Sequence, residues 1–321
     1  ANFLGQFDSY TQPVYLQTSS VKPLTIKGLD SSVEVNSFFY VKPSLEVEGV
    51  IAQDGTFVRG ISSGKVGTFM RLRGKGFAKN DLVTLEIGTV SINIDQRIIS
   101  DKDGEFTTDI KIPRIVGGTK EITATGTSGD VASTTFTITA QLLSINGFPI
   151  TSVGFTPVDV QVDDVVSIVG DGFLSTQTIS FEVGISGQGS LQNIGMQSAE
   201  TDGSLKTTFT VPIMSYGPKV IRLTTSAPSS QINIVGIRVV GRIKPGGISN
   251  RRSGFPEPVG SDNNSIYLWG DGFEENKPLT VTLTPQSGGS AVQIANENLL
   301  DRYGSAGPKT NSSGRFAEVE F

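Results

Sequence analysis

One pattern occurs three times in this sequence and limits the folds that the chain can adopt. Each copy is a run of alternating apolar and polar residues that leads into Gly-x-Gly-Phe, and the copies end at Phe77, Phe173 and Phe273. Alternation with a period of two is typical of a β-strand with one buried face. The copies lie about 100 residues apart, which is the length of one small β-domain, so the sequence predicts an array of such domains.

The repeat continues beyond the phenylalanines. A second alternating run follows each copy, and we expect it to form a hairpin with the run before it. Next comes a turn in which glycine supplies a positive φ. The three turns contain Asp103-Gly104, Asp202-Gly203 and Ser313-Gly314.

The recurring glycine and phenylalanine predict a tight turn followed by a side chain anchored in the core. A phosphate-binding loop is the alternative interpretation, but such a loop needs a following helix and a lysine, which are missing here. The predicted structural turn and core anchors are Gly76, Phe77, Gly172, Phe173, Gly272 and Phe273.

Composition supports an all-β chain. Charged residues are 18% of the chain, β-branched residues are abundant and no long amphipathic helical pattern occurs. We expect two complete β-sandwiches, at residues 46–141 and 142–242. Residues 1–45 match the second half of a repeat, and residues 243–321 match the first half. The predicted fold is therefore all-β, with tandem immunoglobulin-like β-sandwich domains and partial domains at both ends.

The two partial domains have two explanations, both of which the sequence leaves open. The final partial domain of one copy could be completed by the initial partial domain of the next, which would give a head-to-tail polymer. Alternatively, the sequence is an excerpt of a longer array of repeats. Glycine, proline and apolar residues near 46–64, 142–163 and 243–261 indicate linkers that are held against adjacent domains.

The residue counts exclude most catalytic chemistry. The chain has no His and no Cys, which removes the commonest general base and metal ligand, thiolate nucleophiles, structural zinc sites and disulfides. The 31 acidic residues are scattered through turns and strand faces without a convincing pair for acid–base catalysis. We therefore expect no enzymatic activity and no catalytic residues.

Three candidate sites remain. Asp101 and Asp103 begin like the oxygen-rich loop of a calcium site, although the distal bidentate Glu is missing and an ordinary Asp-Gly turn is the alternative. Calcium is thus the one candidate cofactor. Two Asn-x-Ser sequences, at Asn263 and Asn311, are candidate glycosylation sites, with chance occurrence as the alternative.

Charge and hydropathy argue against two classes of partner. A net charge of −5 argues against nucleic acid, and no run of about 18 apolar residues predicts a membrane span in this segment. The basic cluster Arg238, Arg242, Lys244, Arg251 and Arg252 has two interpretations: a solvated linker face, or an ion-pair seam to a neighbouring domain or subunit.

The series of Gly-x-Gly-Phe, an alternating strand, Asp-Gly, Pro and Gly-x-x-Lys-x-Ile resembles the immunoglobulin-like repeats of prokaryotic, especially archaeal, cell-surface proteins, such as surface-layer subunits and extracellular filaments. The resemblance implies a secreted structural protein on the cell surface that self-assembles with copies of itself, head-to-tail or in a lattice. The alternative is an adhesin or an array of carbohydrate-binding modules that recognises cell-surface glycans. Such a module needs an exposed aromatic platform, and we expect Trp269 in the core instead.

Overall fold

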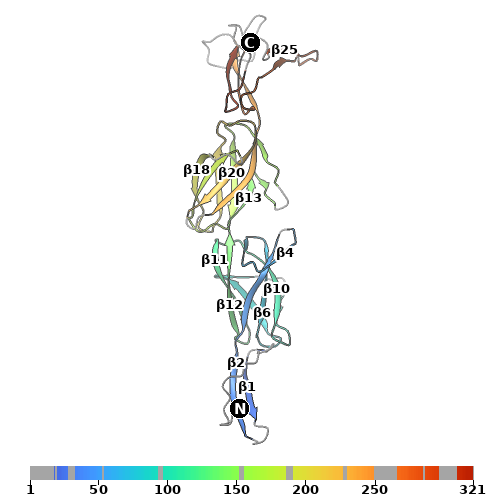
Figure 1. The fold of residues 1–321 in the computed structure, drawn as a ribbon, viewed down its shortest axis with the longest axis vertical. Coiled ribbons are helices and arrows are strands. Elements are labelled where there is room, and N and C mark those ends of the chain that lie inside the picture. Colours follow the sequence, from blue (N-terminus) through green and yellow to red (C-terminus); the bar gives the residue numbers. More distant parts are fainter. Residues whose placement is uncertain are drawn as a thin grey trace, which may run out of the picture. The chain divides into compact units, whose positions relative to one another are not determined.

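The computed structural model describes residues 18, 20–27, 33–52, 54–92, 97–151, 155–185, 191–226, 230–248, 266–284, 286–295 and 309–320. All regular structure in these residues is β-strand (Figure 1). The chain divides into two compact units, Ala1–Gln141 with Asp171–Leu174, and Leu142–Gly170 with Ser175–Phe321. None of the described residues forms a helix that could cross a membrane.

The first domain, β3 to β12, contains two sheets. One sheet has the strand order β10-β6-β3-β4, and the other has the order β5-β12-β11-β7-β8, with β9 also paired to β7. The strands are β3 (Ser44–Ile51), β4 (Phe57–Arg59), β5 (Ser63–Lys65), β6 (Phe69–Lys75), β7 (Leu82–Ile87), β8 (Val90–Ser91), β9 (Ile98–Ile99), β10 (Phe106–Lys111), β11 (Gly118–Gly126) and β12 (Val131–Thr139).

The strands on either side of Gly-x-Gly-Phe do not form the expected hairpin. Strand β6 pairs with β3 and β10, whereas β7 pairs with β11 in the other sheet. The turn at Gly76 thus carries the chain from one sheet to the other. The prediction was wrong because alternation identifies a strand but not its partner, which here lies far away in the sequence.

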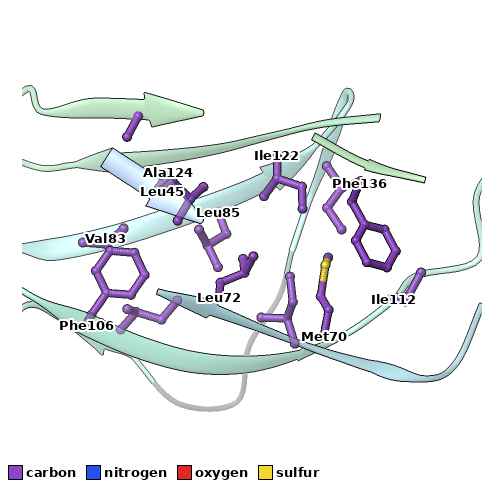
Figure 2. Packing of buried hydrophobic residues seen from close by; sticks show 14 of the residues in the cluster. Leu45, Met70, Leu72, Val83, Leu85, Phe106, Ile112, Ile122, Ala124 and Phe136 are labelled. Carbon is purple, nitrogen blue, oxygen red and sulfur yellow. The ribbon is translucent and has the colours of Figure 1, made fainter. Parts of the chain in front are cut away.

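The core of the first domain lies between its two sheets. Met70 and Leu72 on β6 face Ile122 on β11 and Phe136 on β12, and all four side chains are almost completely buried (Figure 2). Their alternate positions along each strand place these apolar residues on the inner face. The first domain is therefore a β-sandwich with one continuous core.

The second domain, β13 to β21, repeats this arrangement. Its sheets have the orders β14-β13-β16-β19 and β15-β21-β20-β17-β18, in which β16, β17, β20 and β21 correspond to β6, β7, β11 and β12. The strands are β13 (Gln141–Ile145), β14 (Phe148–Pro149), β15 (Val158–Val160), β16 (Val165–Asp171), β17 (Thr178–Gly184), β18 (Gln192–Ser198), β19 (Leu205–Thr210), β20 (Gly217–Thr225) and β21 (Gln231–Val239).

The segments expected to be linkers contain the first strands of the sandwiches. Residues 46–64 hold most of β3 and all of β4, and residues 142–163 hold β13, β14 and β15. Strand β3 is an inner strand of its sheet, between β4 and β6. The linker prediction failed because glycine and proline also occur at bulges and short edge strands, where they interrupt the alternation.

The N-terminal hairpin consists of β1 (Ser20–Lys27) and β2 (Glu34–Val41), which pair antiparallel. Among the described residues, neither strand pairs with any further strand. Two residues separate β2 from β3, as two separate β21 from the following strand, and one residue separates β12 from β13. The N-terminal hairpin therefore occupies the chain position of the hairpins β11–β12 and β20–β21.

The third domain has strands that correspond to only part of a sandwich. Its described sheets are β22-β23-β26 and β24-β25, which match β3-β6-β10 and β7-β8 of the first domain. The strands are β22 (Arg242–Ile248), β23 (Ile266–Asp271), β24 (Val281–Leu283), β25 (Val292–Ala295) and β26 (Phe316–Glu320). Within the described part of this domain, no hairpin corresponds to β11–β12.

Candidate assembly surfaces

The glycine of the second repeated turn packs directly on the Gly-Phe turn. Gly104 has a φ of +74°, and its carbonyl oxygen accepts a hydrogen bond of 3.1 Å from the Phe77 amide. A Cβ on Gly104 would lie 2.2 Å from the Phe77 carbonyl oxygen. In the third domain the Phe273 amide donates to the Gly314 carbonyl at 3.0 Å. Both turns thus require glycine for space and for backbone conformation.

The Gly-Phe turns also accept a hydrogen bond from a loop of the preceding repeat. The Gly117 amide donates to the Phe173 carbonyl at 2.8 Å, and the Tyr216 amide donates to the Phe273 carbonyl at 2.8 Å. Gly117 follows β10, and Tyr216 follows the corresponding strand β19. The same backbone contact therefore recurs at two successive turns, which means that these turns connect repeats as well as strands.

The variable residue of Gly-x-Gly-Phe is a buried aspartate in two repeats. Burial raises the pKa of Asp171, while a hydrogen bond from Gln141 and the positive charge of Arg114 act in the opposite direction. Asp271 accepts a hydrogen bond of 3.1 Å from Arg242, a residue that also pairs with Asp163 at 2.9 Å. One carboxylate oxygen, Oδ1, of each of Asp171 and Asp271 has no hydrogen-bond partner in the described structure.

The basic cluster therefore forms ion pairs where it is described. Arg238 binds Asp159 through two hydrogen bonds of 2.6 and 2.8 Å, across the parallel strands β15 and β21. Arg242 lies in the Asp271 and Asp163 pairs. The side chain of Lys244 and the whole of Arg251 and Arg252 lie outside the described residues.

The candidate calcium residues form a local turn. Asp101 Oδ1 accepts hydrogen bonds from the amides of Asp103 at 2.8 Å and Glu105 at 2.9 Å, which hold the pKa of Asp101 below its usual range. Asp103 pairs with Lys102 at 2.6 Å. In the described ranges no three acidic side chains converge as metal ligands. Calcium binding at Asp101 and Asp103 thus stays one of two interpretations, beside an ordinary Asp-Gly turn.

Of the two candidate glycosylation sites, Asn263 lies outside the described residues. Asn311 is exposed and takes the position of Asp101 in the third domain. Its Oδ1 accepts hydrogen bonds from the amides of Ser313 at 2.9 Å and Arg315 at 3.0 Å. Asn311 therefore caps its turn, and its glycosylation stays a prediction.

The N-terminal hairpin exposes apolar side chains on both faces. Leu24, Ile26 and Val35 lie on one face, at exposures of 49%, 46% and 59%, and Phe38 and Tyr40 lie on the other. These aromatic and aliphatic residues form a contiguous apolar surface on one small ribbon, unlike apolar residues that are scattered singly over a protein surface. The sequence analysis predicted a partial domain here but not a ribbon with apolar side chains exposed on both faces, because that exposure depends on which strands are paired.

The core of the third domain is more exposed than that of the complete domains. Phe77 and Phe173 have no exposed surface, whereas Phe273, which we expected at an equivalent buried position, is only half-buried. The packing of the ring is otherwise retained, because Phe273 meets Phe316 edge-to-face at 5.5 Å, as Phe77 meets Phe106 at 5.3 Å. The described part of the third domain thus keeps the Phe-Phe packing of a complete domain, while its Phe273 ring is less buried.

Trp269 is not a core residue. It is half-buried, and the guanidinium of Arg315 lies 5.7 Å from its ring centroid. The neighbouring Leu268 instead aligns with the buried residues Leu72 and Ile168. The prediction that Trp269 lies in the core was wrong, because an alternating pattern does not identify which face of the strand is buried.

A buried lysine marks the first strand of the hairpin in the second domain. Lys219 on β20 is 2% exposed, and its Nζ lies 3.3 Å from the Tyr216 carbonyl and 3.5 Å from Ser215 Oγ. Burial lowers the pKa of Lys219, whereas the negative charge of Glu275 acts against this shift. A lysine occurs at the same position in all three hairpins, as Lys22, Lys120 and Lys219.

No protein-family model matches the sequence, and the comparison with curated proteins found no relative. Among solved structures, the chain is similar to a tetra-tandem repeat from the extending region of a large adhesion protein, with 13% identity over 95% of this chain and 81% of the other, at a TM-score of 0.29. It is also similar to the D0-D1 domain of intimin, with 13% identity over 62% of this chain and 96% of the other, at a TM-score of 0.22. A third similar structure is a putative membrane-anchored protein from Corynebacterium diphtheriae, with 11% identity over 69% of each chain and a TM-score of 0.24.

Proposed function

We propose that this chain is a non-enzymatic, secreted structural protein of the cell surface that self-assembles into a filament or a surface layer (S-layer). The observation that carries the proposal is a pair of β-surfaces without partner strands among the described residues, namely the N-terminal hairpin and the edge of β24 in the third domain. Exposed apolar strands with free edges favour pairing with another chain. The extracellular location rests on the resemblance to immunoglobulin-like repeats of prokaryotic surface proteins.

The repeated turns support a structural role. The positions that recur in the repeats serve folding: they form alternating strands, a glycine turn with positive φ and a phenylalanine anchor. The backbone hydrogen bonds to Phe173 and Phe273 come from a loop of the preceding repeat. A chain built in this way transmits load through backbone hydrogen bonds. Electron microscopy of the purified chain tests the proposal: we expect fibres or two-dimensional lattices, and dispersed particles of monomer size would contradict it.

An adhesive function is the second candidate, because Trp269 lies at the surface of β23 rather than in the core. The accessible part of a half-buried indole can stack on a sugar ring, and Arg315 beside it can donate hydrogen bonds to hydroxyl groups. Binding of the soluble chain to a glycan array, lost in Trp269→Ala, would favour this function. Unchanged binding in Trp269→Ala, or no binding by the wild type, would reject it.

A further inference from the structure

We propose that the N-terminal hairpin of one copy completes the third domain of a second copy by pairing β1 with the free edge of β24. The proposal rests on the self-assembly proposed above and specifies which strands form the contact. The partner is a second copy of this chain. Four features of the described residues support it: the residues on the hairpin's inner face, the free edge of β24, the register of the complete domains and the connection between β2 and β3.

The inner face of the hairpin resembles that of β11–β12, the hairpin that completes the first domain. Lys22 lies opposite Phe39 in the N-terminal hairpin, as Lys120 lies opposite Phe136 in β11–β12. The next inner pair joins a large apolar residue to a hydroxyl residue in both hairpins, Leu24 with Ser37 and Ile122 with Thr134. The pair after it is apolar in both, Ile26 with Val35 and Ala124 with Ala132. In the first domain this face is the inner layer of the sandwich, so the hairpin carries a core face without a core.

A lysine contact gives the hairpin a further likeness to β20–β21. Lys22 Nζ donates to Thr18 Oγ1 at 3.1 Å, and Lys219 Nζ approaches Ser215 Oγ at 3.5 Å, in both cases to the residue four positions earlier. The side chain of Lys22 thus already has the local contact of its buried counterpart. The hairpin is therefore preorganised for the position that Lys219 occupies in a complete domain.

The acceptor is the edge of β24. In the complete domains both edges of β7 and β17 are covered: β8 and β9, or β18, lie on one side, and β11 or β20 lies on the other. In the third domain β24 pairs with β25, and its other edge has no partner strand among the described residues. The edge of β24 without a partner among the described residues is therefore the one that a hairpin covers in the complete domains, and Phe273 is only half-buried.

The complete domains fix the register of the exchange. In the first domain β11 pairs with β7 through Ile122 with Ile87, Thr123 with Glu86 and Ala124 with Leu85. Alignment on Phe77 and Phe273 and on the hairpin lysines transfers these pairs to the two copies. The predicted pairs are Leu24 with Leu283, Thr25 with Thr282 and Ile26 with Val281. The central pair, Thr25 with Thr282, joins two uncharged residues that can hydrogen-bond across strands.

The connection after the hairpin favours a second copy that continues the array. Strand β2 leads into β3 of its own first domain after two residues, as β21 leads into β22 after two residues. A docked hairpin would therefore continue into the next sandwich in the way that consecutive domains do within one chain. Each copy would use one hairpin and one open domain, and such a head-to-tail contact generates an open-ended polymer.

Disulfide cross-linking tests the register, because the chain has no Cys of its own. Equal amounts of Thr25→Cys and Thr282→Cys, mixed and oxidised, should give a covalent dimer, and the double variant should give a ladder of multimers. Asn36→Cys lies on β2, one strand further from β24, and should give no dimer with Thr282→Cys. Within one chain, Thr123→Cys with Glu86→Cys is the positive control, since these residues are register partners. A cross-linked monomer from the double variant, or no product at all, would overturn the proposal.

A pair of charge substitutions separates this contact from self-assembly in general. Ile26 and Val21 are both exposed in the free hairpin but lie on opposite faces. Ile26→Asp should raise the concentration needed for assembly at least tenfold, whereas Val21→Asp should leave it within a factor of about two. If Ile26→Asp assembles like the wild type, the strand exchange is wrong and the proposed function remains. If the wild type itself stays monomeric, both are wrong.

Discussion

The Cβ position of Gly104 lies 2.2 Å from the carbonyl oxygen of Phe77, so the second turn of the repeat cannot carry a side chain without moving the first. Gly314 has the same relationship to Phe273, at 1.9 Å. These contacts explain why the two turns recur together along the chain. A substitution at Gly104 therefore tests the packing of the two turns directly.

Gly104→Ala should destabilise the first domain by at least about 2 kcal/mol, because it adds a clash with the backbone to the strain of a positive φ. Gly55→Ala is the matched control: Gly55 also has a positive φ, +85°, but no atom lies within 4 Å of its Cβ position. The control should cost about 1 kcal/mol. Chemical denaturation of both variants measures the difference, and equal losses would contradict the packing of the two turns.

Phe77→Ala should cost about 3–5 kcal/mol in the free energy of unfolding of the first domain, as expected for a completely buried phenylalanine. Phe273→Ala should cost less in the unassembled chain, because its ring is only half-buried there. Thermal unfolding of monomeric protein compares the two variants. A larger loss at Phe273 than at Phe77 would show that the third domain is already closed.

Asp171→Asn should stabilise the protein at neutral pH by about 1–3 kcal/mol, because it removes a buried charge with an unpaired oxygen. The pKa of Asp171 is raised on folding, so the folded state binds the proton more tightly than the unfolded state. The penalty therefore applies above the folded-state pKa and disappears as the pH falls below 3.8, the ordinary value. Unfolding curves from pH 7 to pH 3 should converge for wild type and variant. A difference that grows toward low pH would contradict this assignment.

Calcium should leave the melting temperature unchanged, because Asp101 already uses Oδ1 to cap its own turn. Asp101→Asn should retain that cap, since Asn311 makes the same two hydrogen bonds in the third domain. Calorimetry of chelator-treated protein with and without calcium provides the measurement. A rise in the wild type that the Asn variant lacks would instead establish a calcium site at Asp101 and Asp103.

Local features of the sequence were enough to predict the repeats. Alternation identified β6, β16 and β23, and glycines with positive φ, such as Gly76 and Gly172, have a conformation that few other residues adopt. These signals depend on neighbouring residues only. For this reason the all-β class and the position of the turns could be inferred without knowledge of strand pairing.

Features that depend on distant residues could not be predicted in the same way. The partner of β7 is β11, which lies more than 30 residues further along the chain, and nothing at Leu82–Ile87 specifies it. Trp269 and Leu268 alternate equally well, so only the assembled sheet shows that Leu268 faces the core side. The exposure of the N-terminal hairpin likewise follows from which strands are paired, not from its own sequence.

Sedimentation velocity of the purified wild-type chain, over a thousandfold range of concentration, tests self-assembly most directly. We expect a series of species whose size keeps growing as the concentration rises, because each added copy presents a new N-terminal hairpin and a new β24 edge. A single boundary of monomer size at every concentration would contradict it, and so would a closed dimer that does not grow further.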